Sequence, residues 1–171
     1  MEQLVQMDLF TLLGVELQKP AKKVIQKRKA ETSKMDILYK KYQGVVLEDA
    51  GSILSNDFKS FSRAVKAAWN ELCGQMDAEL VAYYNGHYYM SGFIKKGERV
   101  LYVSYSEPRW CPINLDESGV KGILIREAKH EKDYGGSHSH NHFCSFRNMK
   151  QEAERILSST WEYSWEKQEQ H

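Results

Sequence analysis

The sequence is poor in the features that mark most enzymes and most secreted or membrane proteins. It contains neither a GxxxxGK(S/T) loop nor a GxGxxG loop, so both common glycine-rich phosphate cradles are missing. Its three cysteines, Cys73, Cys111 and Cys144, form no CxxC pair, which is typical of a reduced cytoplasmic protein. No apolar run approaches the ~20 residues that cross a bilayer, and no charged-then-apolar leader is recognisable. We therefore expect a cytoplasmic protein without a membrane partner.

The chain also lacks a strong net charge. Its 24 lysines and arginines face 23 acids, for a net charge of +1, so no overall field attracts nucleic acid. The basic residues are concentrated in residues 19–34, where Glu31 is the single acid. We expect this stretch to be a basic linker that makes weak contact with DNA.

The remaining composition is that of one folded domain. Apolar residues make up 42% of the sequence and charged residues 27%, values in the range of globular proteins. A length of 171 residues suffices for a single core. We place a docking tail at residues 1–18, the linker at 19–34 and one domain at 35–171.

Apolar periodicity predicts two main helices in this domain. Ser55 can cap the first, which Gly74 would end, and Ser145 can cap the second. A shorter helix near residues 35–42 would stop at Gly44. The apolar positions recur at the i, i+3, i+4 spacing of a helix face: Phe58, Phe61, Val65, Ala68, Trp69 and Leu72 in the first, and Phe146, Met149, Ala153, Ile156 and Leu157 in the second.

Aromatic and β-branched residues predict strands between the two helices. Asn85-Gly86 separates two aromatic runs, a strong hairpin signal. The predicted strands are 79–85, 87–95, 99–106 and 120–126. A polar loop would follow at 129–144, and Trp161, Tyr163 and Trp165 can form an edge strand or a hook. The predicted fold is α+β: an antiparallel sheet of four to five strands with the two main helices packed on one face, plus an N-terminal tail.

One short peptide near the N-terminus suggests a partner. Gln6, Met7, Asp8, Leu9 and Phe10 resemble the pentapeptide that bacterial DNA polymerases and repair proteins insert into a pocket of the replication sliding clamp. In such a peptide Leu9 and Phe10 are the apolar anchors, and Gln6 fixes the register through hydrogen bonds. The alternative is that the same region is an amphipathic helix packed on the core, with this apolar stripe: Leu4, Met7, Leu9, Phe10, Leu12 and Leu13.

Two basic sets are candidate binding surfaces for protein or nucleic acid. Lys59, Arg63 and Lys66 share the polar side of the first main helix, as a binding stripe or as an ordinary solvated face. The second set is a tyrosine-rich sheet surface with a basic rim, typical of single-strand binders but equally of protein-binding patches, which we favour. Its members are Tyr83, Tyr88, Tyr102, Tyr105, Lys95, Lys96 and Arg99.

Alternating histidines suggest a metal site. His138, His140 and His142 would point to one side of an extended strand, and neutral imidazoles bind zinc and other transition metals. Cys144 would fall on the same side and could add a thiolate. The alternative is a polar surface loop that binds no cofactor.

Other candidate reactive groups are scattered. Glu127, His130, Glu131 and Asp133 follow the fourth predicted strand, where acid–base residues are often found. Cys73 is expected in the core, and Cys111 is the more exposed thiol.

Several short stretches of the domain resemble small accessory proteins of bacterial phages, plasmids and conjugative elements. They are Gly86 to Ile94, Ile123 to Arg126 and Lys132 to Gly136. The resemblance implies a mobile-element role and assigns no catalytic residue. We therefore hypothesise a non-enzymatic protein that docks on the sliding clamp and engages replication, repair or defence machinery. Two alternatives remain: an inhibitor of a host defence nuclease, such as an anti-CRISPR or anti-restriction protein, and a metal-dependent enzyme built on the histidine loop.

Overall fold

The computed structural model describes residues 32–47, 55–86, 89–106, 110–135 and 140–159. The predicted docking peptide, most of the basic linker and the C-terminal tryptophans lie outside these ranges. All the described ranges belong to one unit that begins at Thr32. None of the helices in them is both long and apolar enough to span a membrane.

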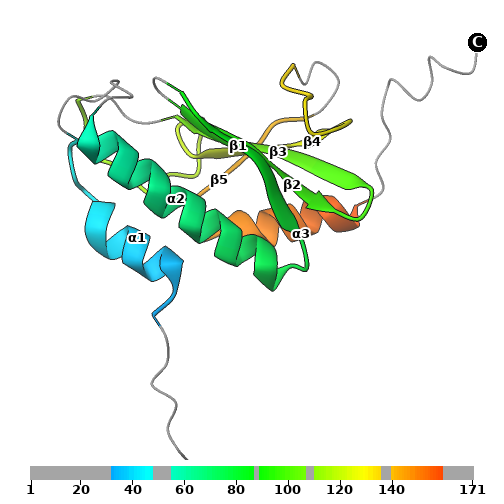
Figure 1. The fold of residues 1–171 in the computed structure, drawn as a ribbon, viewed down its shortest axis with the longest axis horizontal. Coiled ribbons are helices and arrows are strands. Elements are labelled where there is room, and N and C mark those ends of the chain that lie inside the picture. Colours follow the sequence, from blue (N-terminus) through cyan, green and yellow to red (C-terminus); the bar gives the residue numbers. More distant parts are fainter. Residues whose placement is uncertain (1–31, 48–54, 87–88, 107–109, 136–139, 160–171) are drawn as a thin grey trace, which may run out of the picture. The chain divides into compact units, whose positions relative to one another are not determined.

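The described residues form three helices and five strands (Figure 1). The N-terminal helices are α1 (Lys34–Tyr42) and α2 (Asn56–Gln75). The strands are β1 (Glu79–Asn85), β2 (Tyr89–Lys96), β3 (Arg99–Ser106), β4 (Ile123–Ala128) and β5 (His142–Cys144). The last helix is α3 (Met149–Ser158).

The sheet is an antiparallel meander in which each strand pairs with its neighbours in the sequence. The strand order is β1-β2-β3-β4-β5, and every adjacent pair is antiparallel. All three helices lie on one side of the sheet (Figure 1). The predicted α+β fold with helices on one face of an antiparallel sheet is confirmed.

The main core lies between the helices and this face of the sheet. Alternate residues of the strands point into it, and the apolar stripes of α2 and α3 cover them. Trp69, Tyr105 and Phe61 are among the largest side chains of this layer, and all are buried. Burying apolar area of this kind is the dominant stabilising term.

The α2 helix begins as its sequence predicts. The Ser55 side chain accepts a hydrogen bond from the Phe58 N–H at 3.3 Å, so Ser55 is the predicted N-cap. The helix continues through Gly74 and ends at Gln75, followed by Asp77 with a φ of 52°. The prediction that Gly74 ends the helix was therefore wrong by one residue, because Asp77 makes the left-handed turn instead.

Two boundaries near the C-terminus also differ from expectation. The α3 helix starts at Met149 with Asn148 as N-cap, whereas the Ser145 Oγ accepts the Asn148 N–H in a turn that precedes the helix. The fourth strand spans Ile123–Ala128 and not 120–126, because a turn with a Gly122 N–H to Gly119 carbonyl hydrogen bond (2.7 Å) occupies its predicted start.

A bulge in β1 changes which side chains reach the core. The register of β1 on β2 shifts between Val81 and Tyr84, and Ala82 has a φ of 49°. An extra residue in one strand moves the following side chains to the opposite faces. Tyr83 therefore points to the helices, where its Oη donates to the Ser62 carbonyl at 2.9 Å.

Candidate functional site

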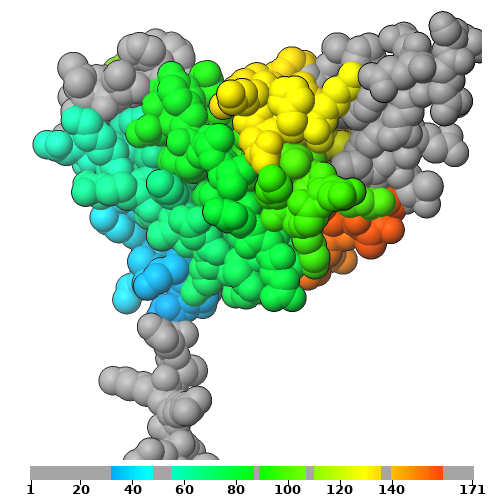
Figure 2. Space-filling model, turned by 45° about the vertical axis from the view of Figure 1, so that its right-hand side comes forward, coloured from blue at the N-terminus to red at the C-terminus, as the bar shows by residue number. Residues whose placement is uncertain are grey.

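The sheet face turned away from the helices, the open face, carries a second group of aromatic side chains. The ladder places Phe93 of β2 beside Tyr102 of β3, and Tyr102 beside Arg126 of β4. One row therefore crosses three strands. Tyr134, from the segment after β4, packs onto this row. In the space-filling view the light-green to yellow segment around residues 110–135 stands directly beside the green strands (Figure 2).

Phe93, Tyr102 and Tyr134, the aromatic cluster, hold one another in edge and tilted contacts. The ring centroids of Phe93 and Tyr102 are 5.4 Å apart, those of Phe93 and Tyr134 5.1 Å, and those of Tyr102 and Tyr134 6.1 Å. Such pairs each contribute about 0.5–1.5 kcal/mol beyond their buried area. Phe93 is buried, while Tyr134 remains 53% exposed. The three rings therefore hold one another in place, and the Tyr134 side chain remains accessible to solvent.

Arg126 is the buried charge beneath this cluster. It is only 3% exposed, and its guanidinium carbon lies 4.5 Å from the Tyr102 ring centroid, a cation–π contact. Its Nη1 donates to the Glu127 carbonyl at 3.0 Å and its Nη2 to the Asp133 carbonyl at 2.6 Å. The Asp133 carboxylate lies 3.8 Å from Nη1. Burial lowers the pKa of Arg126 and Asp133 opposes that shift, so the guanidinium stays charged and anchors the segment after β4.

Two tyrosines extend the open face toward the β1–β2 turn. Tyr84 is 50% exposed and Tyr89 is 42% exposed, and their ring centroids are 5.7 Å apart. Tyr89 lies on the same side of β2 as Phe93 by strand alternation. Tyr84 reaches this side because the bulge at Ala82 shifts the register. The open face thus presents exposed tyrosine at two places.

The predicted tyrosine-rich surface is only partly formed. Tyr102 lies on the open face, but Tyr105 is buried against Phe61 and Phe146 on the helix side, and Tyr83 packs edge-on against Trp69 at 5.9 Å. The interpretation of all these tyrosines as one stacking face was therefore wrong for Tyr83 and Tyr105. Tyr88 lies outside the described residues.

The predicted basic rim divides between the two faces of the sheet. Lys95 lies on the open face and forms an ion pair with Glu131, which raises the pKa of Lys95 and lowers that of Glu131. Lys96 and Arg99 fall on the helix side by alternation. Arg99 donates to the carbonyls of Leu157 and Ser159 at the end of α3, so it satisfies backbone groups that a helix leaves unpaired.

Lys59, Arg63 and Lys66 line the exposed side of α2, as their helical spacing predicts. The Arg63 Nε donates to the Lys59 carbonyl at 3.2 Å, and the Lys66 ammonium lies 5.4 Å from the Tyr83 ring centroid, a cation–π contact. The three basic residues therefore lie in the helix layer, apart from the open face.

The histidine loop is described only in part. His138 lies outside the described residues, and His140 is exposed. His142 is in β5, where Arg155 Nη2 donates to its Nδ1 at 3.1 Å, so Nε2 is the nitrogen left for another ligand. Burial raises the pKa of Cys144 to about 12, which disfavours the thiolate a metal requires. Within the described ranges no three His, Cys, Asp or Glu side chains converge on a point that could hold a metal ion.

The carboxylates after β4 serve local structure. The Asp133 Oδ2 accepts the Lys129 N–H at 3.0 Å and lies near Arg126, while Glu131 pairs with Lys95. The His130 Nδ1 accepts the Lys132 N–H at 3.1 Å. These contacts build the segment that carries Tyr134 onto the sheet.

The three thiols differ in exposure, and this gives a testable prediction. Cys73 and Cys144 are buried, whereas Cys111 is exposed, as the sequence indicates for Cys73 and Cys111. Burial raises the pKa of Cys73 from 9.0 to about 12, which lowers its thiolate fraction at neutral pH about a thousandfold. With a chromogenic disulfide reagent, we expect one thiol per native chain to react promptly and all three to react in denaturant. Prompt reaction of any thiol in the native Cys111→Ser variant would contradict this.

Comparison with known proteins adds no family and no relative: no protein-family model, curated protein or solved structure matches the chain. The open face and the motifs of the sequence are therefore the features from which a function can be inferred. The predicted clamp-docking residues, Gln6, Met7, Asp8, Leu9 and Phe10, lie outside the described residues. Sequence reasoning missed Arg126, Tyr134 and the Tyr84–Tyr89 pair.

Proposed function

We propose that this chain is a non-enzymatic accessory protein of a bacterial mobile element. In this proposal it docks on the DNA sliding clamp through Gln6–Phe10 and binds a second protein on the open face of its sheet. The observation that carries the second part is the exposed Tyr84–Tyr89 pair, which lies on the same face of the sheet as the aromatic cluster and Arg126.

The chemistry of the open face suits a protein partner. Tyrosine buries a large apolar ring at low entropic cost and keeps a hydroxyl for hydrogen bonding, so it is enriched at the energetic centres of protein interfaces. Arg126 and the aromatic cluster hold the centre of the face rigid, and a preorganised surface loses less entropy on binding. The charges of Lys95 and Glu131 cancel, so the face has no strong attraction for a polyanion.

The docking peptide supplies the first test. We expect the intact chain to bind the bacterial sliding clamp with micromolar affinity, because each buried anchor contributes about 1.5–3 kcal/mol before ordering costs. The Leu9→Ala/Phe10→Ala variant should bind at least about a hundredfold more weakly, since both anchors are lost. Isothermal titration calorimetry measures both affinities.

A control within the same peptide sharpens this test. Asp8→Asn changes a side chain that stays in water, so it should keep most of the affinity. Equal binding by the intact chain and the double variant, or no binding by either, would refute clamp docking and leave the open face unaffected.

The open face also favours the second candidate, inhibition of a host defence nuclease. Such an inhibitor would act by covering the nuclease with its tyrosines rather than by mimicking DNA charge. In a DNA-cleavage assay with a CRISPR effector nuclease, Tyr84→Ser/Tyr89→Ser should abolish inhibition. Lys40→Ser, at an exposed position of α1 in the helix layer, is the matched control. An intact chain that leaves cleavage unchanged would exclude this candidate for that nuclease.

A further inference from the structure

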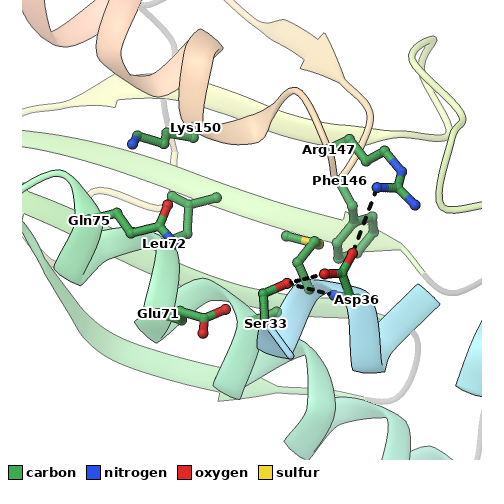
Figure 3. Close-up of a pocket in the computed structure, with 10 residues that line it drawn as sticks. Ser33, Asp36, Glu71, Leu72, Gln75, Phe146, Arg147 and Lys150 are labelled. Carbon is green, nitrogen blue, oxygen red and sulfur yellow. Dashed lines mark hydrogen bonds and ion pairs between the residues drawn. The ribbon is translucent and has the colours of Figure 1, made fainter. Parts of the chain in front are cut away.

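A pocket of about 280 Å³ opens where the three helices meet, on the side of the sheet opposite the open face (Figure 3). The start of α1, the C-terminal half of α2 and the start of α3 each contribute to its wall. None of the sequence motifs and no part of the proposed function uses this pocket.

The floor of the pocket is apolar. Leu72 of α2 and Phe146, which precedes α3, lie at its centre (Figure 3). Both side chains are buried against the main core. They offer a surface on which a small apolar side chain can pack.

Opposite charges stand on different walls of the pocket. Lys150 comes from α3 and Glu71 from α2. The Glu71 Oε2 accepts the Lys34 N–H at 2.7 Å, which fixes the carboxylate, and Oε1 has no hydrogen-bond partner among the described residues. No ion pair between Glu71 and Lys150 is found among the described residues, and the Lys150 ammonium lies 3.9 Å from Glu154 on its own helix. The two charges therefore lie on different walls of the pocket and do not pair with each other.

Gln75 and Arg147 add further polar groups to the two ends of the pocket. The Gln75 carboxamide lies on the same side of the pocket as Lys150 (Figure 3), where its NH₂ can donate beside the ammonium. At the other end Arg147 stacks over Tyr39 at 4.0 Å and lies 3.9 Å from Asp36. An anion alone would meet repulsion from Glu71 and Asp36, and a cation alone would meet repulsion from Lys150 and Arg147.

We propose that this pocket binds a small zwitterion, a free α-amino acid with an apolar side chain. Its carboxylate would be held by Lys150 and Gln75, its ammonium by Glu71, and its side chain by Leu72 and Phe146. The volume of about 280 Å³ lies just below the usual range of ~300–1,000 Å³ for drug-sized ligands, which favours one amino acid over a dipeptide or nucleotide.

The test is a titration followed by two-dimensional amide NMR. L-Leucine, L-methionine and L-phenylalanine serve as probes at millimolar concentrations. N-acetyl-L-leucine and L-leucine methyl ester, which lack the ammonium and the carboxylate charge respectively, are the matched ligands. We expect at least one free amino acid to shift the amide signals of Leu72 and Lys150. Both blocked ligands should bind at least about tenfold more weakly than free leucine.

Variants assign the binding to the pocket. Lys150→Gln and Glu71→Gln should each weaken binding about tenfold, and Glu71→Gln keeps an acceptor for the Lys34 N–H, so the start of α1 is preserved. Lys59→Gln, on the exposed side of α2, is the charge control and should bind normally. Equal binding of free and blocked leucine, variants that bind as well as the control, or no amide shift with any of the three probes would overturn the proposal.

Discussion

Replacing Arg126 by methionine is expected to lower the free energy of unfolding by about 3–5 kcal/mol, the usual cost of removing one partner of a buried ion pair. Methionine replaces the apolar stem of arginine but cannot donate to the carbonyls of Glu127 and Asp133. It also removes the cation–π contact with Tyr102 and the counter-charge beside the Asp133 carboxylate. Urea unfolding followed by circular dichroism measures the change.

Two further variants separate charge from geometry. Arg126→Lys keeps the charge but not the planar fork that reaches both carbonyls, so an intermediate loss is expected. Arg126→Met/Asp133→Asn removes both charges and should be more stable than the sum of the two single changes predicts. A loss below about 0.5 kcal/mol for Arg126→Met, the range of ordinary surface changes, would show that Arg126 does not anchor this segment.

Replacing Gly122 by alanine is expected to destabilise the fold by about 3 kcal/mol, at the upper end of ordinary overpacking costs. An added Cβ would lie 2.4 Å from the Glu117 carbonyl oxygen and 2.7 Å from that of Cys144. Both are backbone atoms, so relief requires the turn before β4 or strand β5 to move. The same urea experiment measures the loss.

Gly135→Ala is the matched control for this change. A Cβ at Gly135 meets no atom within 4 Å, so its effect should stay within about 0.5 kcal/mol. If the Gly122→Ala variant were as stable as the Gly135→Ala variant, this result would contradict the close backbone contact between the turn and β5.

The main elements were predictable because their signals are local. The apolar spacing of α2 fixes that helix from a few neighbouring residues. The Asn85-Gly86 signal predicted the hairpin correctly but placed its turn wrongly, because Asn85 pairs with Met90 and the Gly86 N–H donates to the Tyr89 carbonyl at 2.8 Å. The three-residue strand β5 was not predictable, because His142–Cys144 lies in a polar stretch and pairs only through β4. The bulge at Ala82 was equally unpredictable, because nothing in the local sequence marks a residue with positive φ there. The bulge places Tyr83 on the helix side of the sheet and not on the open face.

The open face could be predicted only in part, because it depends on register between strands. Alternation in Ile123–Ala128 places Arg126 and Leu124 on one side, which was available from the sequence. The contact of Arg126 with Tyr102 follows from the β3–β4 register. The position of Tyr134 follows from the turn in which Asp133 accepts the Lys129 N–H. The paired tyrosines Tyr84 and Tyr89 needed the bulge to bring them together.

The meander order of the sheet has a consequence for how the chain folds. Each strand finds its partner next to it in the sequence, and pairing from β1 to β3 requires only short loops to close, whereas β4 joins β3 across residues 107–122. Chains rich in local contacts fold fast. The core beneath the sheet is different, because α3 fills it from the far end of the described sequence. During synthesis the hairpins can form in order on α2, while completion of the core waits until α3 leaves the ribosome.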